Sequence, residues 1–130
     1  MSYTTFEYKN LTVSQDQITG FETLRVSCEV KNTGSLTGDE VVQVYLTDDV
    51  ASDEVPKRQL VGFKRVHLAP DAAEVVNFQI KPRQFAYVNK AGQWVIEPGT
   101  FTVFVGGGQP GIAGGLMVKI SKKGENFVVA

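Results

Sequence analysis

The sequence predicts an all-β protein, an antiparallel β-sandwich of about seven or eight strands. Three observations favour this fold class. Apolar and polar residues alternate over short stretches, which is the period of a strand with one buried face. Turn residues separate these stretches at roughly 8–12-residue intervals, the spacing typical of a sandwich. No stretch of useful length has a helical period.

Length and composition fit one globular domain. The chain has 130 residues, enough for a single hydrophobic core. Hydrophobic residues make up 42% and charged residues 21%, both near globular averages. With 13 basic and 14 acidic residues, the net charge is -1, which argues against nucleic acid or a membrane as a partner, because phosphate binding requires a basic surface. No apolar run approaches the ~20 residues that span a bilayer.

The first strand is predicted at residues 6–13. Its apolar positions change parity between Tyr8 and Leu11. Because neighbouring side chains of a strand point to opposite faces, this change predicts a β-bulge or a crossing between sheets near Asn10.

Cys28 lies in the second predicted strand, residues 24–31, where apolar and polar residues alternate strictly. It shares a face with Leu24, Val26 and Val30. This position predicts a buried structural thiol rather than a reactive one. A single cysteine cannot form an internal disulfide.

A polar turn at residues 32–39 precedes the third predicted strand, residues 41–46. The inward-facing set of this strand consists of Val42, Val44 and Leu46. Val41 and Tyr45 have the opposite parity and are also apolar. This pattern predicts a strand that is covered on both sides.

The rest of the chain continues the same pattern of strand and turn. Further strands are predicted at residues 58–68, 76–80, 85–88, 94–96, 101–105 and 116–120. We expect one turn of 3₁₀ helix at 82–84 and a hairpin turn at 89–92. Residues 106–115 hold six glycines, but this segment joins two strands and contains Pro110, which favours a flexible connection over a phosphate-binding loop.

Residues 47–57 form a polar loop that is long enough to contact a molecule outside the domain. Its carboxylates are Asp48, Asp49, Asp53 and Glu54. Such groups bind Ca²⁺ or act in pairs in glycosidases, but their spacing matches no calcium-loop motif, and one loop is a poor frame for a glycosidase pair. We therefore favour a solvated acidic loop and predict neither a metal nor a cofactor.

His67 is the single histidine. Catalysis would require a nucleophile or an acid beside it, whereas its sequence neighbours are Lys64, Arg65 and Val66. A solvent-facing residue at the end of a strand is favoured. No catalytic residue is predicted in this chain.

The aromatic residues are more numerous than one sandwich core is expected to hold. They include Tyr45, Phe63, Phe85, Tyr87 and Trp94. Core packing accounts for most of them, an interface with another domain ranks second, and a sugar-binding platform ranks third. The candidate contacts with a neighbouring domain are Val41, Tyr45, Phe63 and Trp94.

Four motifs follow one another along the chain. They are EVKNTG with GDEVVQVY (29–34 and 38–45), PKRQLVGFKRV (56–66), LAP (68–70), and EPGTF with VG (97–101 and 105–106). Their order and spacing resemble the immunoglobulin-like, fibronectin type III-like domain that closes many family 3 glycoside hydrolases. The similarity extends over about residues 3–108. We expect one such domain at residues 1–121 and a C-terminal tail at 122–130.

The resemblance implies a non-catalytic accessory domain of a larger enzyme of the β-glucosidase or β-xylosidase type. In that family the nucleophilic Asp belongs to an upstream barrel domain and the acid/base Glu typically to an α/β domain, so no catalytic residue is carried over to this chain. The implied partners are these two upstream domains, with the loop at 47–57 at the active-site rim. The alternative is a stand-alone carbohydrate-binding or adhesive module that contacts oligosaccharides. A hydrolase in its own right is the least favoured interpretation.

Overall fold

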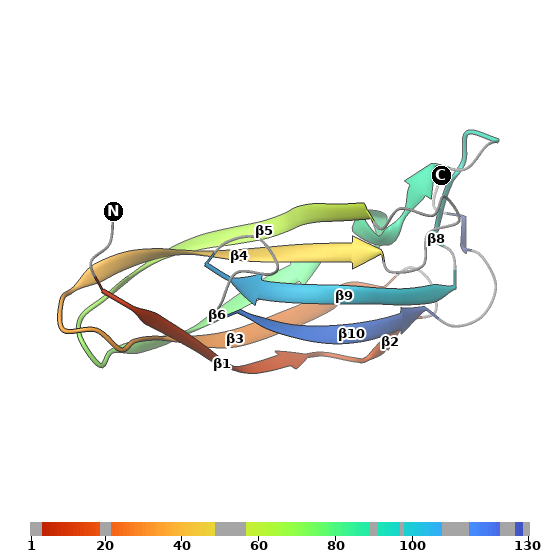
Figure 1. Cartoon of the computed structure of the whole chain (residues 1–130). Helices are drawn as coiled ribbons and strands as arrows, with labels where there is room; N and C mark the ends of the chain where they lie inside the picture. The colour runs from red at the N-terminus through yellow and green to blue at the C-terminus, as the bar shows by residue number, and fades with distance from the viewer. Residues whose placement is uncertain are drawn as a thin grey trace.

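Two β-sheets pack face to face in the computed structural model (Figure 1). The structure describes residues 4–18, 22–48, 57–88, 91–96, 98–107, 115–122 and 127–128. Seven strands contain seven or more residues, and shorter strands extend the arrangement. The predicted all-β sandwich is confirmed.

The first sheet has three antiparallel strands in the order β1-β3-β6. They are β1 (Phe6–Val13), β3 (Leu24–Asn32) and β6 (Ala73–Ile80). The register of β1 against β3 shifts between Lys9 and Thr12, and Asn10 has a φ of 57° there. Asn tolerates this left-handed conformation better than most residues. The bulge predicted from the parity change is therefore present.

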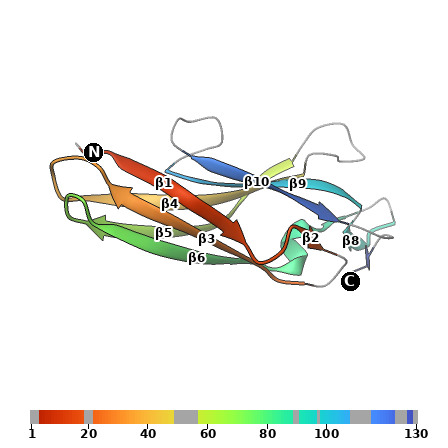
Figure 2. The same cartoon turned by 90° about the horizontal axis from the view of Figure 1, so that it is seen from below.

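The second sheet has five strands in the order β2-β10-β9-β4-β5. They are β2 (Gln17–Ile18), β10 (Leu116–Lys122), β9 (Gly99–Gly106), β4 (Gly38–Asp48) and β5 (Lys57–Leu68). All pairs are antiparallel except that of β2 with β10. Figure 2 shows this sheet and the three-stranded sheet as the two layers of the sandwich.

A small third sheet has the order β11-β8-β7. Its strands are β11 (Phe127–Val128), β8 (Trp94–Ile96) and β7 (Tyr87–Val88). β7 and β8 pair antiparallel, as the predicted hairpin requires, and Gly92 between them has a φ of 81°, which glycine adopts without strain. The predicted 3₁₀ turn is η1 (Pro82–Phe85), which extends one residue further than expected.

The hydrophobic core lies between the two large sheets. The strands of both large sheets contribute inward-facing side chains to it. Along β3, buried residues alternate strictly with exposed or half-buried ones. The fully buried side chains include Leu24, Val26, Val30, Val42, Val44, Val76, Ile80, Val103 and Ile120. Cys28 is 1% exposed and burial raises the pKa of its thiol, so the predicted burial is confirmed.

Asn32 fixes the turn between β3 and β4. Its side chain is completely buried. The amide nitrogen donates to the carbonyl oxygens of Leu36 (2.8 Å) and Leu68 (2.9 Å). The side-chain oxygen accepts from the Thr4 hydroxyl (2.7 Å) and the Gly34 amide (2.9 Å). A buried amide with all of these bonds made joins three segments of chain, and the bonds offset the cost of its desolvation.

Candidate docking surface

The side of the five-stranded sheet that faces away from the core carries the candidate functional residues, and we call it the outer face. On β4, Val42, Val44 and Leu46 are buried in the core, so the residues between them point outward. Val41 is 36% exposed and Tyr45 is half-buried. Among the described residues, the chain therefore leaves much of this face open to solvent.

Four apolar side chains form a row across the outer face. The strand register places Tyr45 of β4 opposite Leu60 of β5 and Phe104 of β9, and Phe104 opposite Met117 of β10. We call this set the apolar row. A bulge at Val61 lets Phe63, three positions after Leu60, share the same face. Phe63 is 70% and Met117 62% exposed.

Phe104 gives the apolar row a buried centre. It is only 4% exposed, yet it does not belong to the core cluster between the sheets. Two glycines make room for its ring: a Cβ on Gly106 would lie 2.9 Å from Phe104 Cε1, and one on Gly115 would lie 2.1 Å from Cζ. The first and last glycines of the 106–115 segment are therefore explained by this ring.

Basic side chains border the apolar row on both sides. On one side, Arg58 and Lys119 belong to the next cross-strand row, where the Lys119 ammonium donates to the Thr102 hydroxyl (3.1 Å). On the other side, beyond Phe63 and two outward rows away, Arg65 lies opposite Val41 and its Nε is 3.8 Å from Asp39 Oδ2. The outer face thus has an apolar centre and a largely cationic border.

Asp39 and His67 lie opposite each other near the end of the β4–β5 hairpin, with His67 Nδ1 bonded to Asp39 Oδ1. The His67 hydrogen bond lowers the pKa of Asp39, and the charges of His67 and Arg65 lower it further. Both side chains are exposed. His67 is the solvent-facing residue near a strand end that its sequence context predicts.

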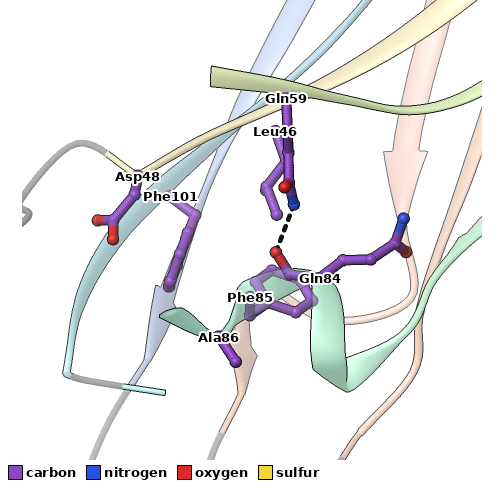
Figure 3. Close-up of a pocket in the computed structure, with 7 residues that line it drawn as sticks. All are labelled: Leu46, Asp48, Gln59, Gln84, Phe85, Ala86 and Phe101. Atoms are coloured by element: carbon purple, nitrogen blue, oxygen red, sulfur yellow. Dashed lines mark hydrogen bonds between the residues drawn. The ribbon is translucent and has the colours of Figure 1, made fainter. Parts of the chain in front are cut away.

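A small pocket lies at the end of β4 (Figure 3). Its lining residues are Leu46, Asp48, Gln59, Gln84, Phe85, Ala86 and Phe101. Phe85 and Phe101 meet edge to face with ring centroids 5.1 Å apart, and Gln59 Nε2 donates to the Gln84 carbonyl (2.6 Å). The cavity volume of about 60 Å³ is far below the ~300–1,000 Å³ of small-molecule sites, so the pocket suits at most a single side chain.

The described residues contain no group of three His, Cys, Asp or Glu side chains that would hold a metal ion. In the same part of the chain, no helix is long and apolar enough to cross a membrane.

Comparison with known families identifies the domain. The model of the fibronectin type III-like domain matches residues 40–109, which is more than half of the chain. The chain belongs to the fibronectin type III-like domain family. The matched segment includes β5, β6, β9 and all of β4 except its first two residues, and with them most of the outer face.

Individual relatives of this fibronectin type III-like domain are much longer proteins. A β-xylosidase of Formosa agariphila is 43% identical over 82% of this chain and 15% of its own length. β-Glucosidase 3B of Thermotoga neapolitana is 37% identical, with a TM-score of 0.81 over 98% of this chain and 17% of its own. A family 3 (GH3) β-glucosidase of Bifidobacterium adolescentis is 33% identical, with a TM-score of 0.77 over 92% and 18%. The domain thus spans less than a fifth of each relative.

The candidate contacts predicted from the sequence fall in two places. Val41, Tyr45 and Phe63 share the outer face of the fibronectin type III-like domain. Trp94 is 44% exposed but belongs to β8 in the small sheet, so the structure does not bring it into the apolar row. Sequence reasoning missed Leu60, Phe104 and Met117. Phe104 and Met117 are apolar residues at the outward parity of their strands, whereas Leu60 shares its parity with the buried Val66 and Leu68 and reaches the outer face through the bulge.

The candidate active-site-rim residues are only partly described. Asp48 is the last residue of β4 and lines the pocket in Figure 3, across from Gln84. Asp49, Asp53 and Glu54 lie outside the described residues. Their placement at an active-site rim stays a prediction.

Proposed function

We propose that this fibronectin type III-like domain is a non-catalytic accessory domain of a family 3 glycoside hydrolase, and that it packs on and stabilises the barrel and α/β domains of that enzyme. The observation that carries the proposal is the match to β-glucosidases and β-xylosidases, which covers most of this chain but only 14–15% of the length of the curated relatives. Most of each relative, and hence most of its machinery, lies outside the part that this chain resembles.

The positions of the carboxylates support a non-catalytic role. Glycosidases place two carboxyl groups about 5–10 Å apart on either side of a bound sugar. Four of the described carboxylates bond to neighbours on the protein itself, in the pairs Lys9–Glu29, Lys64–Glu74, Tyr8–Glu40 and His67–Asp39. The pocket beside Asp48 is too small for a sugar ring. These features favour a role in packing over chemistry.

Comparing the whole polypeptide with its parts tests this function. The whole polypeptide, the same polypeptide without residues 1–130, and this chain alone would be assayed on aryl β-glucosides and aryl β-xylosides. We expect turnover by the whole polypeptide, loss of stability and activity in the shortened one, and none by this chain. Turnover by this chain alone, or a whole polypeptide that lacks hydrolase activity, would overturn the proposal.

A second candidate is an oligosaccharide-binding module, which the exposure of Trp94 and Phe63 favours, because sugar platforms use exposed aromatic rings. Trp94 is the single tryptophan, so its fluorescence reports directly on a ligand at β8. Titration of the chain with cello- and xylo-oligosaccharides tests this candidate. A saturable change in Trp94 fluorescence supports sugar binding, and an unchanged spectrum argues against it.

A further inference from the structure

We propose that the outer face of the five-stranded sheet is the surface by which this domain docks on the remainder of its own polypeptide, and that the partner surface presents apolar side chains bordered by carboxylates. The inference rests on the proposed function, since it names the contact surface for the packing described above. It also assigns contact roles to Leu60, Phe104 and Met117.

Exposed apolar residues are concentrated on this face. Among the described residues, seven large apolar side chains are exposed, and four of them are Val41, Leu60, Phe63 and Met117. The outward side of the three-stranded sheet has only Val75 from this set. Isolated apolar residues are normal on a protein surface, whereas a contiguous group bordered by polar residues marks an interaction site.

The apolar row has the dimensions of an interface centre. It crosses four neighbouring strands, a distance of roughly 14 Å at the usual strand spacing, and Val41 to Tyr45 cover a similar distance along β4. Phe104, at the centre of the row, is already excluded from solvent and packs against Gly115. An apolar centre with a polar border is the usual anatomy of a protein interface.

The charges of the border identify the partner's chemistry. Arg58, Arg65 and Lys119 surround the apolar row, and Asp39 is the carboxylate that the described strands place on this face. Asp39 is already paired with His67 and Arg65. The face is therefore cationic although the chain has a net charge of -1, which favours carboxylates opposite it.

The same charges argue against a second copy of this chain as the occupant. Two copies meeting through this face would bring arginine and lysine close to arginine and lysine, which opposes association. An oligosaccharide is also a poor match. Tyr45 donates its hydroxyl hydrogen to Gln43 Oε1 (2.8 Å), so this donor is already used within the face and is not offered to a sugar hydroxyl.

Hydroxyl-radical footprinting tests the contact surface by comparing side-chain oxidation in the whole polypeptide and in this chain alone. We expect oxidation of Phe63 and Met117 to fall by about fivefold or more in the whole polypeptide, because the centre of an interface excludes water. Val75 serves as the internal control and should not change. Equal oxidation of Phe63 in both samples, or protection at Val75 instead, would overturn this docking surface while leaving the accessory function intact.

Paired variants provide a second readout. Phe63→Asp should lower the thermal midpoint of the whole polypeptide more than Val75→Asp does, whereas neither should change that of this chain alone, because both side chains are already in solvent. Arg58→Glu should likewise destabilise the whole polypeptide more than Arg25→Glu on the opposite sheet, and added salt should reduce the difference. If both members of a pair behave alike in the whole polypeptide, the proposal fails.

Two further measurements examine the other occupants. Sedimentation velocity of this chain should show a monomer, and a dimer that Phe63→Asp dissociates would overturn docking on the enzyme. Added cello- or xylo-oligosaccharide should leave the oxidation of Phe63 unchanged, and protection would assign the face to sugar. If removal of residues 1–130 leaves the stability and the activity of the enzyme unchanged, the proposed accessory function fails.

Discussion

The two outward-facing sides of the sandwich differ, although both sheets contribute alternating strands to one core. On the three-stranded sheet, outward side chains bond to one another, as Lys9 Nζ does to Glu29 (3.3 Å) and Ser27 to Asn77. On the five-stranded sheet, the corresponding positions carry the apolar row and Phe63. The inner faces define the fold, whereas the difference between the outer faces is the contrast on which the proposed docking surface rests.

This difference also separates two kinds of surface chemistry. Polar pairs such as Ser27–Asn77 satisfy their hydrogen bonds within the three-stranded sheet and need no partner. Apolar side chains such as Phe63 and Met117 contribute favourable free energy only when another surface removes them from water.

The largest effect is expected at Phe104. Phe104→Ala should lower the free energy of unfolding by roughly 3 kcal/mol, as in a core, because the ring is buried although it lies on the outer face. Chemical denaturation of the chain measures this. A loss near that of an exposed residue, within about 0.5 kcal/mol, would show that the outer face has no buried centre.

Gly115→Ala, combined with Phe104→Ala in a double-mutant cycle, tests whether Gly115 is needed to make room for the Phe104 ring. Alone it should destabilise the domain, since the new Cβ would lie 2.1 Å from Phe104 Cζ. In the Phe104→Ala background the added methyl group has room, so most of the loss should disappear. Additive losses would mean that Gly115 is required for a reason other than the ring.

Cys28, on the inner face of the three-stranded sheet, provides a reference value for the stability cost of a substitution in the core. Cys28→Ser should cost about 1–3 kcal/mol, because a buried hydroxyl loses its water while the apolar site offers it poor partners. The shift in the denaturation midpoint measures the cost, with Ser27→Ala on the exposed side as a control. An unchanged midpoint would contradict the burial of the thiol.

Tyr8 joins the two large sheets, since its hydroxyl on β1 donates to Glu40 Oε2 on β4 (2.8 Å). Tyr8→Phe should cost about 1 kcal/mol at neutral pH. Burial, followed by the Glu40 hydrogen bond and charge, raises the pKa of Tyr8 above its usual range, so the folded state favours the neutral phenol. The stability this contributes is present below about pH 10 and is lost as the pH rises further.

The difference between wild type and Tyr8→Phe should therefore narrow above about pH 10, because phenylalanine does not titrate. Denaturation midpoints measured from pH 7 to 11 test this. A constant difference across that range would show that Tyr8 ionises as readily in the folded as in the unfolded chain.

Local features of this fold could be predicted from the sequence, and cross-strand features could not. Parity alone located the bulge at Asn10 and the burial of Cys28, because both depend on neighbours within one strand. The apolar row depends on the register of four strands that are far apart in the sequence. Single-strand parity also fails at Phe104, since residues 103–105 are all apolar and all buried.

The candidate contacts illustrate the same limit. Phe63 and Trp94 are both exposed aromatic residues within predicted strands, and nothing in their sequence context separates them. The structure assigns Phe63 to the outer face and Trp94 to the small sheet. The bulge at Val61, which aligns Leu60 with Phe63, also arises from pairing with β4 and has no local signal.

The smallest effect concerns the charge of the outer face. Asp39 has a lowered pKa, mainly because His67 bonds to its carboxylate, so its contribution to stability is present above the ordinary pKa of about 4 and is lost as the pH falls below it. Wild type and Asp39→Asn should differ in stability near pH 6 and converge in acid. A gap that persists in acid would mean that the Asp39 charge is not its source.

Carbon-13 NMR titration of the Asp39 carboxyl group checks the cause directly. Its pKa should lie below the ordinary value in the wild type and rise towards it in His67→Gln, whereas equal values would remove His67 as the cause. At neutral pH, Asp39 then remains ionised and committed to His67 and Arg65. Arg58 and Lys119 lie on the far side of the apolar row from this cluster, so that border is the cationic edge of the proposed docking surface.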